Sequence, residues 1–299
     1  MSVSLCVQSV IYGNNSADLL RSFDYLIASI KTARTAASDF ISVVHIVWGD
    51  CSPLPRLSEH EIQKAMSSAA KVNIQFEYHF FSRNLGSAGG HNNLFSKVNT
   101  DFILILNPDT IISPNAISNL LETCKNQKIG IAEARQIPIE HPKYFDPSSL
   151  DTSWASTACA LVRRDACELI NGFDSESFFL YCDDVDFSWR MRLNNFRVVF
   201  RPDAVVFHDK RLSADAKWIA TATEEYYSAE AALLLAHKYS RNDLVDTISK
   251  DFFSHGSAPQ KKALAEFDLR KQQNRLAKQI DNDHRVAQFT GGYYAKHRF

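Results

Sequence analysis

Asp183, Asp184 and Asp186 place three acids within four residues, directly after the aromatic-rich run 178–181. Like charges this close raise one another's pKa and cost free energy unless a cation or a metal compensates. If a helix begins near Asp183, its positive end favours the acids, and Asp186 can pair with Arg190 four residues later. One acid can then be structural while another faces a substrate. An acidic helix start on the surface is the alternative, but the neighbouring aromatic residues favour a lined pocket.

Asn107, Pro108 and Asp109 form a second candidate, directly after the wholly apolar run 102–106. Such a run suits the buried centre of a parallel sheet. A carboxylate where a central strand ends is well placed to hold a divalent ion against a diphosphate. Asn-Pro-Asp is also good turn chemistry, so the segment alone leaves a metal ligand and a plain turn open.

Small residues crowd the segment 84–92, which reads Asn-Leu-Gly-Ser-Ala-Gly-Gly-His-Asn and leads into a helix predicted at residues 91–98. Small residues let a backbone approach a ligand closely, and a helix N-terminus favours anions. The spacing matches neither the GxGxxG dinucleotide pattern nor the GxxxxGK[ST] phosphate loop. A flexible loop is therefore the alternative interpretation.

His208 ends the apolar stretch 204–207. A single histidine after an apolar strand is usually structural. It can also be functional, because neutral imidazole completes metal sites that are otherwise built from carboxylate.

The elements that must position these residues alternate between strand-like and helix-like segments. This βαβ alternation predicts an α/β fold, a doubly wound and mostly parallel sheet flanked by helices, with ligands at the carboxyl ends of the strands. From about residue 211 the composition becomes helical, which predicts a C-terminal helical extension. Strands are predicted at residues 3–12, 41–48, 72–80, 102–106 and 197–208, and helices at 17–36, 59–71, 91–98, 214–238 and 261–281.

The composition is that of an ordinary soluble globular protein, with 45% hydrophobic and 22% charged residues. The net charge of −1 provides no global basic field for nucleic acid. Residues 1–15 lack the features of a signal peptide, and the apolar helical run 229–236 is too short to span a bilayer. We therefore expect a cytoplasmic protein that can rest on a membrane. Six cysteines without a CxxC pair predict buried, reduced thiols and no zinc site.

The four motifs, taken in order, resemble the family 2 glycosyltransferases of bacterial polysaccharide assembly, especially their rhamnosyltransferase-like and galactofuranosyltransferase-like branch. The family pattern is N-x-G-x-(A/G)-G-G-x-N, then L-N-P-D, then G-F-D-E-x-F-F-x-Y-x-E-D-V-D-x-x-x-R, then P-x-A-x-x-x-H. Each motif is weak alone, but four in the right order are a specific signal. They fall here at residues 84–92, 106–109, 172–190 and 202–208, and the resemblance covers about residues 3–240.

The resemblance implies a GT-A fold. Residues 1–210 would be the catalytic domain, with a nucleotide-sugar-binding half at 1–110 and an acceptor-binding half at 111–210, followed by the helical extension 211–299. It implies an inverting transfer from a nucleotide-diphosphate sugar, dTDP-rhamnose or a UDP-sugar, with Mn²⁺ or Mg²⁺. The implied acceptor is a lipid-linked glycan in polysaccharide or O-antigen assembly. The C-terminal helices are candidates for a homodimer contact, a membrane contact or a cover for the sheet.

The family's catalytic roles transfer by position. Asp109 stands in the metal motif and is expected to bind the ion together with His208. Asn107 replaces the first acid of that motif and is expected near the ribose or the metal. Asp184 matches the general base, and Asp183 replaces the glutamate that precedes it.

Other positions match donor and acceptor contacts of the family. The family's second strand ends in D-N-x-S, with the aspartate reading the nucleobase, whereas here Gly49 precedes Asp50 and the acid has moved by one place. Trp154 is equally well interpreted as a core residue. The expected donor contacts are Tyr12, Asp50, Asn84, Gly86, Gly89, Gly90, Asn92, Asn107 and Asp109, and the expected acceptor contacts are Trp154, Phe179, Tyr181 and Arg190.

Two other functions compete with this interpretation. A sugar-phosphate nucleotidyltransferase would need a basic, glycine-rich loop after the first strand, and residues 12–15 carry no basic group. A degenerate sugar-nucleotide or carbohydrate-binding module is favoured by the shifted acid at Asp50 and the amide at Asn107. Retention of Asp109, Asp184 and His208 favours the enzyme.

Overall fold

An eight-stranded mixed sheet runs through the computed structural model, which describes residues 2–36, 41–208, 220–290 and 293–294. Neighbouring strands in the first half of the sheet are parallel, whereas β7 runs antiparallel to both β4 and β6. β6 and β8 are parallel, and β5 closes the edge antiparallel to β8. In order across the sheet the strands are β3 (Gln75–Phe80), β2 (Ile41–Asp50), β1 (Val3–Ile11), β4 (Phe102–Leu106), β7 (Cys159–Arg163), β6 (Ile129–Ile137), β8 (Arg197–His208) and β5 (Thr110–Ile112).

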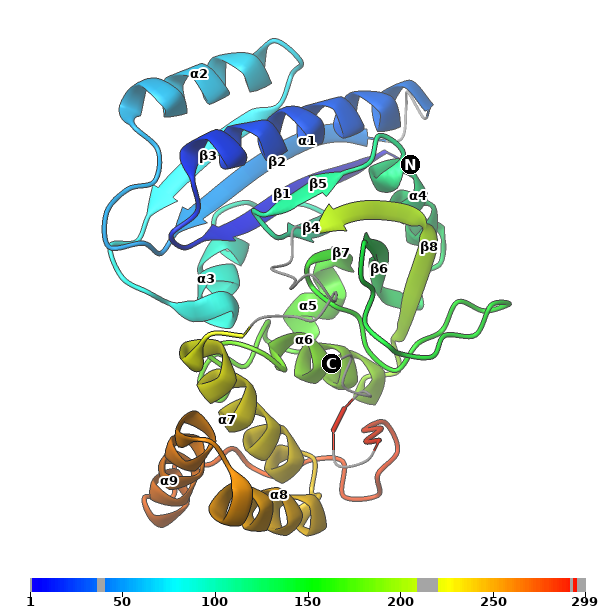
Figure 1. Ribbon diagram of the computed structural model, residues 1–299. Coiled ribbons are helices and arrows are strands. Elements are labelled where there is room, and N and C mark those ends of the chain that lie inside the picture. The colour runs from blue at the N-terminus through cyan, green and yellow to red at the C-terminus, as the bar shows by residue number, and fades with distance from the viewer. Residues whose placement is uncertain (1, 37–40, 209–219, 291–292, 295–299) are drawn as a thin grey trace.

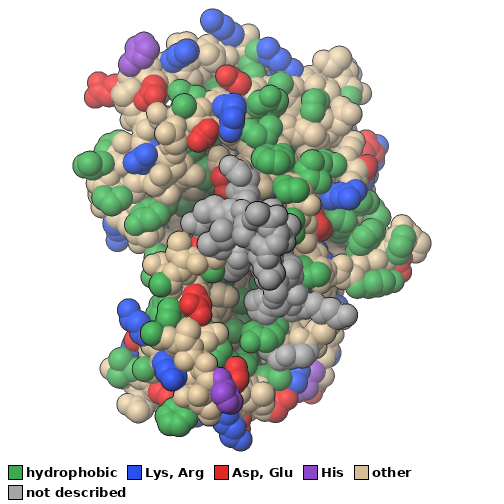
Figure 2. Space-filling model, in the orientation of Figure 1, with side chains coloured by type: hydrophobic (Ala, Val, Ile, Leu, Met, Phe, Trp, Pro, Cys, Tyr) green, Lys and Arg blue, Asp and Glu red, His purple; other side chains and the backbone are tan. Residues whose placement is uncertain are grey.

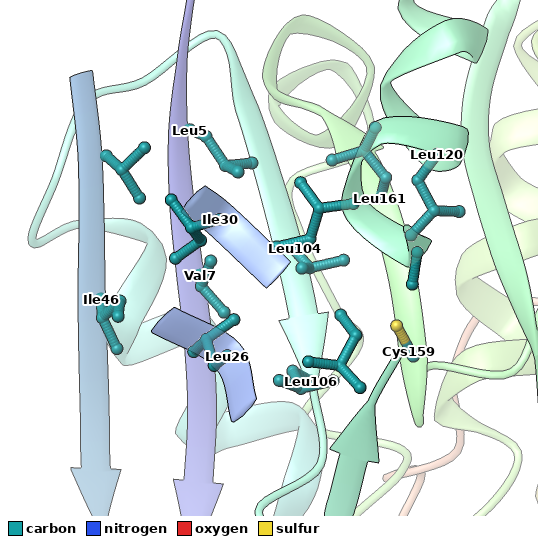
Figure 3. Close-up of a cluster of buried hydrophobic side chains, with 14 of the residues drawn as sticks. Leu5, Val7, Leu26, Ile30, Ile46, Leu104, Leu106, Leu120, Cys159 and Leu161 are labelled. Atoms are coloured by element: carbon teal, nitrogen blue, oxygen red, sulfur yellow. The ribbon is translucent and has the colours of Figure 1, made fainter. Parts of the chain in front are cut away.

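Helices cover both faces of this sheet, as the βαβ alternation predicts (Figure 1). One face packs against α1, α2 and α4, and Figure 3 shows Leu26 and Ile30 of α1 against Leu5, Val7 and Leu104 of the strands. The other face packs against α3, α5 and α6. The helices are α1 (Ser16–Ala36), α2 (Glu59–Ala70), α3 (Gly86–Phe95), α4 (Ala116–Leu121), α5 (Arg164–Leu169) and α6 (Asp183–Leu193), with a 3₁₀ turn η1 (Glu122–Lys125).

The C-terminal helices are α7 (Ala222–Lys238), α8 (Asn242–His255) and α9 (Ala258–Gln272), and α8 and α9 pack against α7, which lies between them and α6 (Figure 1). Their apolar side chains share one core with Trp154, Phe178 and Trp189 of the preceding segment. The predicted helical extension is therefore confirmed, although α8 was not predicted and α9 ends before residue 281. The proposed boundary at residues 210 and 211 lies outside the described residues.

Two other expectations can be compared with the described residues. No helix among them is long and apolar enough to cross a membrane. The described thiols are free and buried, as predicted: Cys6, Cys51, Cys159, Cys167 and Cys182.

Candidate active site

Asp109 and His208 meet at one edge of the sheet. Asp109 follows β4, and His208 ends β8, where it lies opposite Thr110 in the β5–β8 pairing. His208 Nε2 lies 3.4 Å from Asp109 Oδ2, and His208 Nδ1 lies 2.8 Å from the Gln136 side-chain oxygen. An amide oxygen only accepts, so Nδ1 carries the hydrogen and the Nε2 lone pair faces the carboxylate. This arrangement is typical of imidazoles that bind metals.

The donor set at this edge therefore consists of one carboxylate and one correctly oriented imidazole, which fits a divalent ion such as Mn²⁺ or Mg²⁺. Within residues 2–36, 41–208, 220–290 and 293–294, no group of three or more His, Cys, Asp or Glu side chains could hold a metal. An ion held by Asp109 and His208 would therefore need further ligands from water or a substrate.

A left-handed turn introduces the acidic helix α6. Tyr181 and Cys182 both have positive φ, 67° and 54°, and α6 begins at the next residue, Asp183. Non-glycine residues in this conformation cost free energy and are common at functional sites. The predicted helix start near Asp183 is confirmed.

Asp183 and Asp184 share a poorly solvated environment at this helix start. Asp183 is buried, its Oδ2 lacks a hydrogen-bond partner within the described structure, and the Ser87 side chain hydrogen-bonds to its carboxylate. Asp184 is partly exposed, and its Oδ1 accepts from the Val185 backbone N–H at 2.8 Å. Burial, and then the charge of Asp183, raises the pKa of Asp184 to about 7, while Lys143 acts in the opposite direction. A carboxylate with such a pKa is suited to proton transfer near neutrality.

Asp186 has a structural role. It forms the predicted ion pair with Arg190, at 2.7 Å, and also binds Lys238 Nζ at 2.6 Å and the Tyr239 hydroxyl at 3.2 Å. Arg190 Nη1 additionally donates to the carbonyls of Ile170 and Gly172. The contacts found for Arg190 thus hold α6 in place, and acceptor binding by this residue stays a prediction.

The small-residue segment 84–92 is mostly helix, contrary to the expected loop with a helix from residue 91. Asn84 Oδ1 accepts from the Gly86 N–H at 3.0 Å, and α3 begins at Gly86. A side chain at Gly86 would lie 2.2 Å from the Phe179 carbonyl oxygen, and one at Gly90 would lie 2.7 Å from Val10. Close packing against the 178–183 segment and β1 therefore accounts for these two glycines.

Asn92, expected at the donor, clamps the backbone of Phe173. Its amide nitrogen donates to the Phe173 carbonyl at 2.7 Å, and its oxygen accepts from the Phe173 N–H at 2.8 Å. Gly89 differs from Gly86 and Gly90, because a side-chain carbon added there would lie 3.5 Å from Leu85, an ordinary contact distance. Of the three glycines in this segment, Gly89 has the most room for a side chain.

Asp50 is fully buried and engaged by its own loop. Its carboxylate accepts from the backbone N–H groups of Ser52 and Arg56, at 2.9 and 2.7 Å, and from the Tyr78 hydroxyl. At Gly49, where the family pattern has its acid, a side chain would lie 2.6 Å from the Phe81 ring. Base reading by Asp50 stays a prediction, whereas Tyr12, 55% exposed beside this loop, is open to a ligand.

The aromatic residues expected at the acceptor divide into two groups. Trp154 is a core residue, 1% exposed, with its ring 5.1 Å from His141 and 5.2 Å from Tyr294. Phe179 and Tyr181 are only partly buried, and Phe179 stacks on Tyr227 of α7 with a centroid separation of 4.8 Å.

Sequence reasoning missed Glu133 and Lys143. Glu133, on β6, is fully buried, and its Oε2 pairs with Lys143 Nζ from the loop after that strand. Lys143 is also the cation that lowers the pKa of Asp184. The single acid in the stretch Ile129–Ala134, which is otherwise free of polar side chains, was the available signal, because acids are rarely buried without a partner.

The face seen in Figure 2 carries interspersed acidic and basic side chains, and no continuous basic patch is visible among its described residues. A surface cavity of about 680 Å³ lies at the opposite ends of β1 and β4, lined by Ser4, Thr100 and Arg163 among others. None of the predicted site residues lines that cavity, so it is separate from the candidate active site.

The fold of this protein is that of the GT-A structural class, and sequence comparison is consistent with that class. Residues 50–186 match the family described as Glycosyl transferase family 2. The matched segment contains Asp50, Asp109, Asp183 and Asp184, whereas His208 lies beyond it.

Two curated relatives are rhamnosyltransferases. The N-acetylglucosaminyl-diphospho-decaprenol L-rhamnosyltransferase of Mycobacterium tuberculosis is 40% identical over 66 residues, 22% of this chain and 21% of that protein. Rhamnosyltransferase WbbL of Escherichia coli is 23% identical, over 48% of this chain and 71% of WbbL. The first match thus spans about a fifth of its relative's length.

Three solved structures share the fold over most of this chain. GalNAc-T7 with UDP, GalNAc and Mn²⁺ has a TM-score of 0.62 at 13% identity, covering 93% of this chain and 55% of its own. The mannosyltransferase PcManGT of Pyrobaculum calidifontis, in complex with GDP-Man and Mn²⁺, has a TM-score of 0.56 at 11% identity. That match covers 92% of this chain and 82% of PcManGT. S. aureus TarS 1-349 has a TM-score of 0.53 at 13% identity, and the match covers 95% of this chain and 77% of the TarS chain. The predicted GT-A fold is confirmed.

Proposed function

We propose that the protein is an inverting glycosyltransferase that moves a sugar from a nucleotide-diphosphate donor to a glycan hydroxyl, with Asp184 as general base. The observation that carries this proposal is the position of Asp184, a partly exposed carboxylate at the start of α6 whose pKa is raised to about 7. Such a group accepts a proton near neutral pH and is well matched to the activation of a hydroxyl.

In the proposed reaction, the acceptor oxygen attacks the anomeric carbon from the face opposite the nucleotide. The new C–O bond forms as the bond to the diphosphate breaks, and Asp184 takes the hydroxyl proton. The nucleoside diphosphate leaves with the electron pair, so the anomeric centre inverts. Asp109 and His208 would hold a divalent ion, Mn²⁺ or Mg²⁺, which supplies Lewis-acid stabilisation of the leaving diphosphate.

The proposed donor is dTDP-rhamnose, with UDP-sugars as the other class to test. The two rhamnosyltransferase relatives support this choice, and the decaprenol-linked substrate in one of their names supports a lipid-linked acceptor. Phe179 and Tyr181, partly exposed before α6, are the proposed acceptor contacts. A lipid-linked acceptor would bring the protein to the surface of the cytoplasmic membrane. O-antigen or polysaccharide assembly, and a homodimer through the C-terminal helices, belong to the same proposal.

The test is a transfer assay with dTDP-rhamnose or UDP-sugars, Mn²⁺ and a panel of lipid-linked glycan acceptors. Asp184→Asn should lower kcat about 10²-fold or more, the usual contribution of a general base. Asp243→Asn, in an exposed pair with Arg241, is the matched control and should keep full activity. Full transfer by Asp184→Asn would remove the base assignment.

A sugar-nucleotide-binding module without turnover is the second candidate, because Asp50 is engaged by its own loop and Gly49 leaves no room for a side chain. Calorimetric titration of dTDP-rhamnose combined with product analysis separates the two functions. Binding without product across the acceptor panel would favour the module.

A further inference from the structure

A buried glutamine lies behind the imidazole of the candidate metal site. Gln136, near the end of β6, is 1% exposed, and its side-chain oxygen lies 2.8 Å from His208 Nδ1. On the other side of the ring, His208 Nε2 lies 3.4 Å from Asp109 Oδ2. The imidazole therefore lies between an amide and a carboxylate, and each of them contacts a different ring nitrogen.

The sheet sets the separation between this amide and the imidazole. Gln136 lies opposite Val206 in the β6–β8 pairing, and Val206 and His208 point to the same face because side chains alternate along a strand. The backbone N–H of Gln136 donates to Glu140 Oε2 at 2.7 Å. The amide and the ring thus extend side by side from neighbouring strands whose backbones are held in place.

The orientation of the amide decides which ring nitrogen is free to bind an ion. Its oxygen faces the ring, so Nδ1 carries the hydrogen of the neutral imidazole and the Nε2 lone pair faces Asp109. If its NH₂ group faced the ring, Nδ1 would be the acceptor, and Nε2 would carry the hydrogen and donate it to Asp109. A ring nitrogen that carries hydrogen cannot bind a metal. The observed orientation is therefore the one that leaves Nε2 to an ion.

This arrangement is one that a cation would stabilise. The Nε2 lone pair and the Asp109 carboxylate are both electron-rich, and a cation between two such groups relieves their repulsion. The side-chain nitrogen of Gln136 is buried and has no hydrogen-bond partner among the described residues. A buried donor without a partner lowers stability. An apolar side chain of similar length would avoid that loss, so the amide at this position favours a role in the site over a role in the fold.

We propose that Gln136 is a positioning residue for the divalent ion: its amide oxygen holds His208 as the tautomer whose Nε2 completes the ion site with Asp109. The inference rests on the proposed function, in which Asp109 and His208 hold the ion. Gln136 acts through the imidazole and touches neither the ion nor the substrate. Hydrogen-bond partners behind metal-binding histidines contribute about 10- to 100-fold to metal affinity, and the same range is expected here.

The first measurement follows the ion alone. Mn²⁺ is titrated into the purified protein, and binding is measured by the loss of the free-ion electron paramagnetic resonance signal. Gln136→Met should weaken Mn²⁺ binding about tenfold or more, because its thioether is a poor acceptor for Nδ1. Its unfolding temperature without metal should not fall, because an unpaired buried donor is removed. Gln136→Glu keeps an acceptor beside Nδ1 and should bind Mn²⁺ at least as tightly as wild type.

Gln8→Met is the matched control. Gln8, on β1, is also fully buried, and its side-chain nitrogen lies 3.0 Å from an imidazole nitrogen, His91 Nδ1. Its amide also has one atom, Oε1, without a hydrogen-bond partner in the described part of the chain. Neither Gln8 nor His91 belongs to the candidate ion site, so Gln8→Met should leave the affinity for Mn²⁺ unchanged.

The second measurement identifies the tautomer directly. Metal-free protein labelled with ¹⁵N-histidine is studied by NMR at about pH 8.5, where a neutral imidazole carries one proton. The His208 signals are assigned by their absence in His208→Ala. The fraction of rings with hydrogen on Nδ1 should be lower in Gln136→Met than in wild type, because Asp109 then attracts the hydrogen to Nε2. A purely structural role of Gln136 would change stability without changing this fraction.

The outcomes separate this inference from the proposed function. Equal Mn²⁺ affinity in wild type and Gln136→Met, with binding lost in Asp109→Ala, would overturn the inference and keep the ion site. Equal tautomer fractions in wild type and Gln136→Met would also overturn it. If Gln136→Met does not fold, Gln136→Glu replaces it, and weaker Mn²⁺ binding than in wild type would overturn the inference. Equal Mn²⁺ affinity in wild type and Asp109→Ala would instead remove the ion site itself, and this inference with it.

Discussion

The two acidic parts of the candidate site differ in how they are held. At the sheet edge, the Asp109 side chain is 41% exposed, and the ionisable side chain found beside it is His208, with Nε2 3.4 Å from Asp109 Oδ2. At the start of α6, Asp183 is buried and Asp184 is partly buried; burial raises the pKa of both, and Lys143, from the loop after β6, opposes this at Asp184. Strand pairing determines the first geometry, and the second depends on a network of charges.

This difference assigns the two regions different physical tasks. An exposed carboxylate beside an oriented imidazole can take up an ion without leaving a buried charge unpaired. An enclosed carboxylate has a proton affinity that its neighbours control, because nearby charges act more strongly where water is excluded. The helix that carries it must also be held rigidly, and Lys238 of α7 and Tyr239, the residue after that helix, do this through Asp186.

The largest effect should come from the open edge and should be confined to function. Asp109→Ala is expected to lower transfer activity about 10²- to 10³-fold, since several kcal/mol of charge stabilisation are lost. Stability should change little, because the side chain is exposed. Titration of Mn²⁺ and thermal unfolding without metal measure the two quantities. Unchanged Mn²⁺ affinity would remove Asp109 from the metal site.

The enclosed region should respond through stability. Lys238 Nζ contacts Asp174 and Asp186, each at 2.6 Å, and its side chain is 7% exposed. Lys238→Met should cost about 2 kcal/mol in the free energy of unfolding, less than a fully broken buried pair because Arg190 still neutralises Asp186. Denaturant unfolding measures this, with Asp243→Asn as the exposed control, expected within about 0.5 kcal/mol of wild type. Equal values for the two variants would show that α7 does not support α6.

Stability should also depend on pH through Asp184. Its pKa rises from 3.8 to about 7 on folding, so between these values the folded state binds more protons than the unfolded state. Stability from this group therefore falls as pH rises from about 4 to 7 and stays reduced above 7. Asp184→Asn removes the penalty, so its unfolding temperature relative to wild type should rise across this window. A constant difference from pH 4.5 to 8 would contradict the raised pKa.

Much of this architecture was readable from periodicity. The strand Phe102–Leu106, the start of α6 and the pair between Asp186 and Arg190 were all predicted correctly. A wholly apolar run bounded by polar residues and a four-residue charge spacing are local features of the sequence. They could be predicted because they do not depend on contacts with distant segments. The meeting of Asp109 and His208 came from the family resemblance, since β5–β8 pairing joins residues about a hundred positions apart.

The missed features depend on contacts between distant segments. Lys143 lies in an irregular loop, and nothing near it in the sequence shows that its ammonium reaches Glu133 across ten residues. Likewise, the helix α3 begins among glycines that normally disfavour helices. Its start is fixed by Asn84 and by the close approach of Gly86 to Phe179, which only the tertiary structure reveals.

The smallest expected effect tests whether the small-residue segment belongs to the enclosed support or to the donor surface. At Gly89 a side chain has ordinary contact distances, 3.5 Å to Leu85 and 3.8 Å to Ser175. Gly89→Ala should therefore stabilise the protein by about 0.5 kcal/mol, because alanine favours a helix over glycine. Gly90→Ala, which would press on Val10 at 2.7 Å, should instead destabilise it by about 1 kcal/mol.

Thermal shift with dTDP-rhamnose then separates support from donor contact. If Gly89 only supports α3, Gly89→Ala keeps the donor-induced shift of wild type on top of its own higher baseline. If the donor lies on the Gly89 backbone, as the family pattern predicts, the added methyl group reduces that shift while the baseline still rises. The second outcome would assign part of α3 to the donor surface, and the division between the two regions would move accordingly.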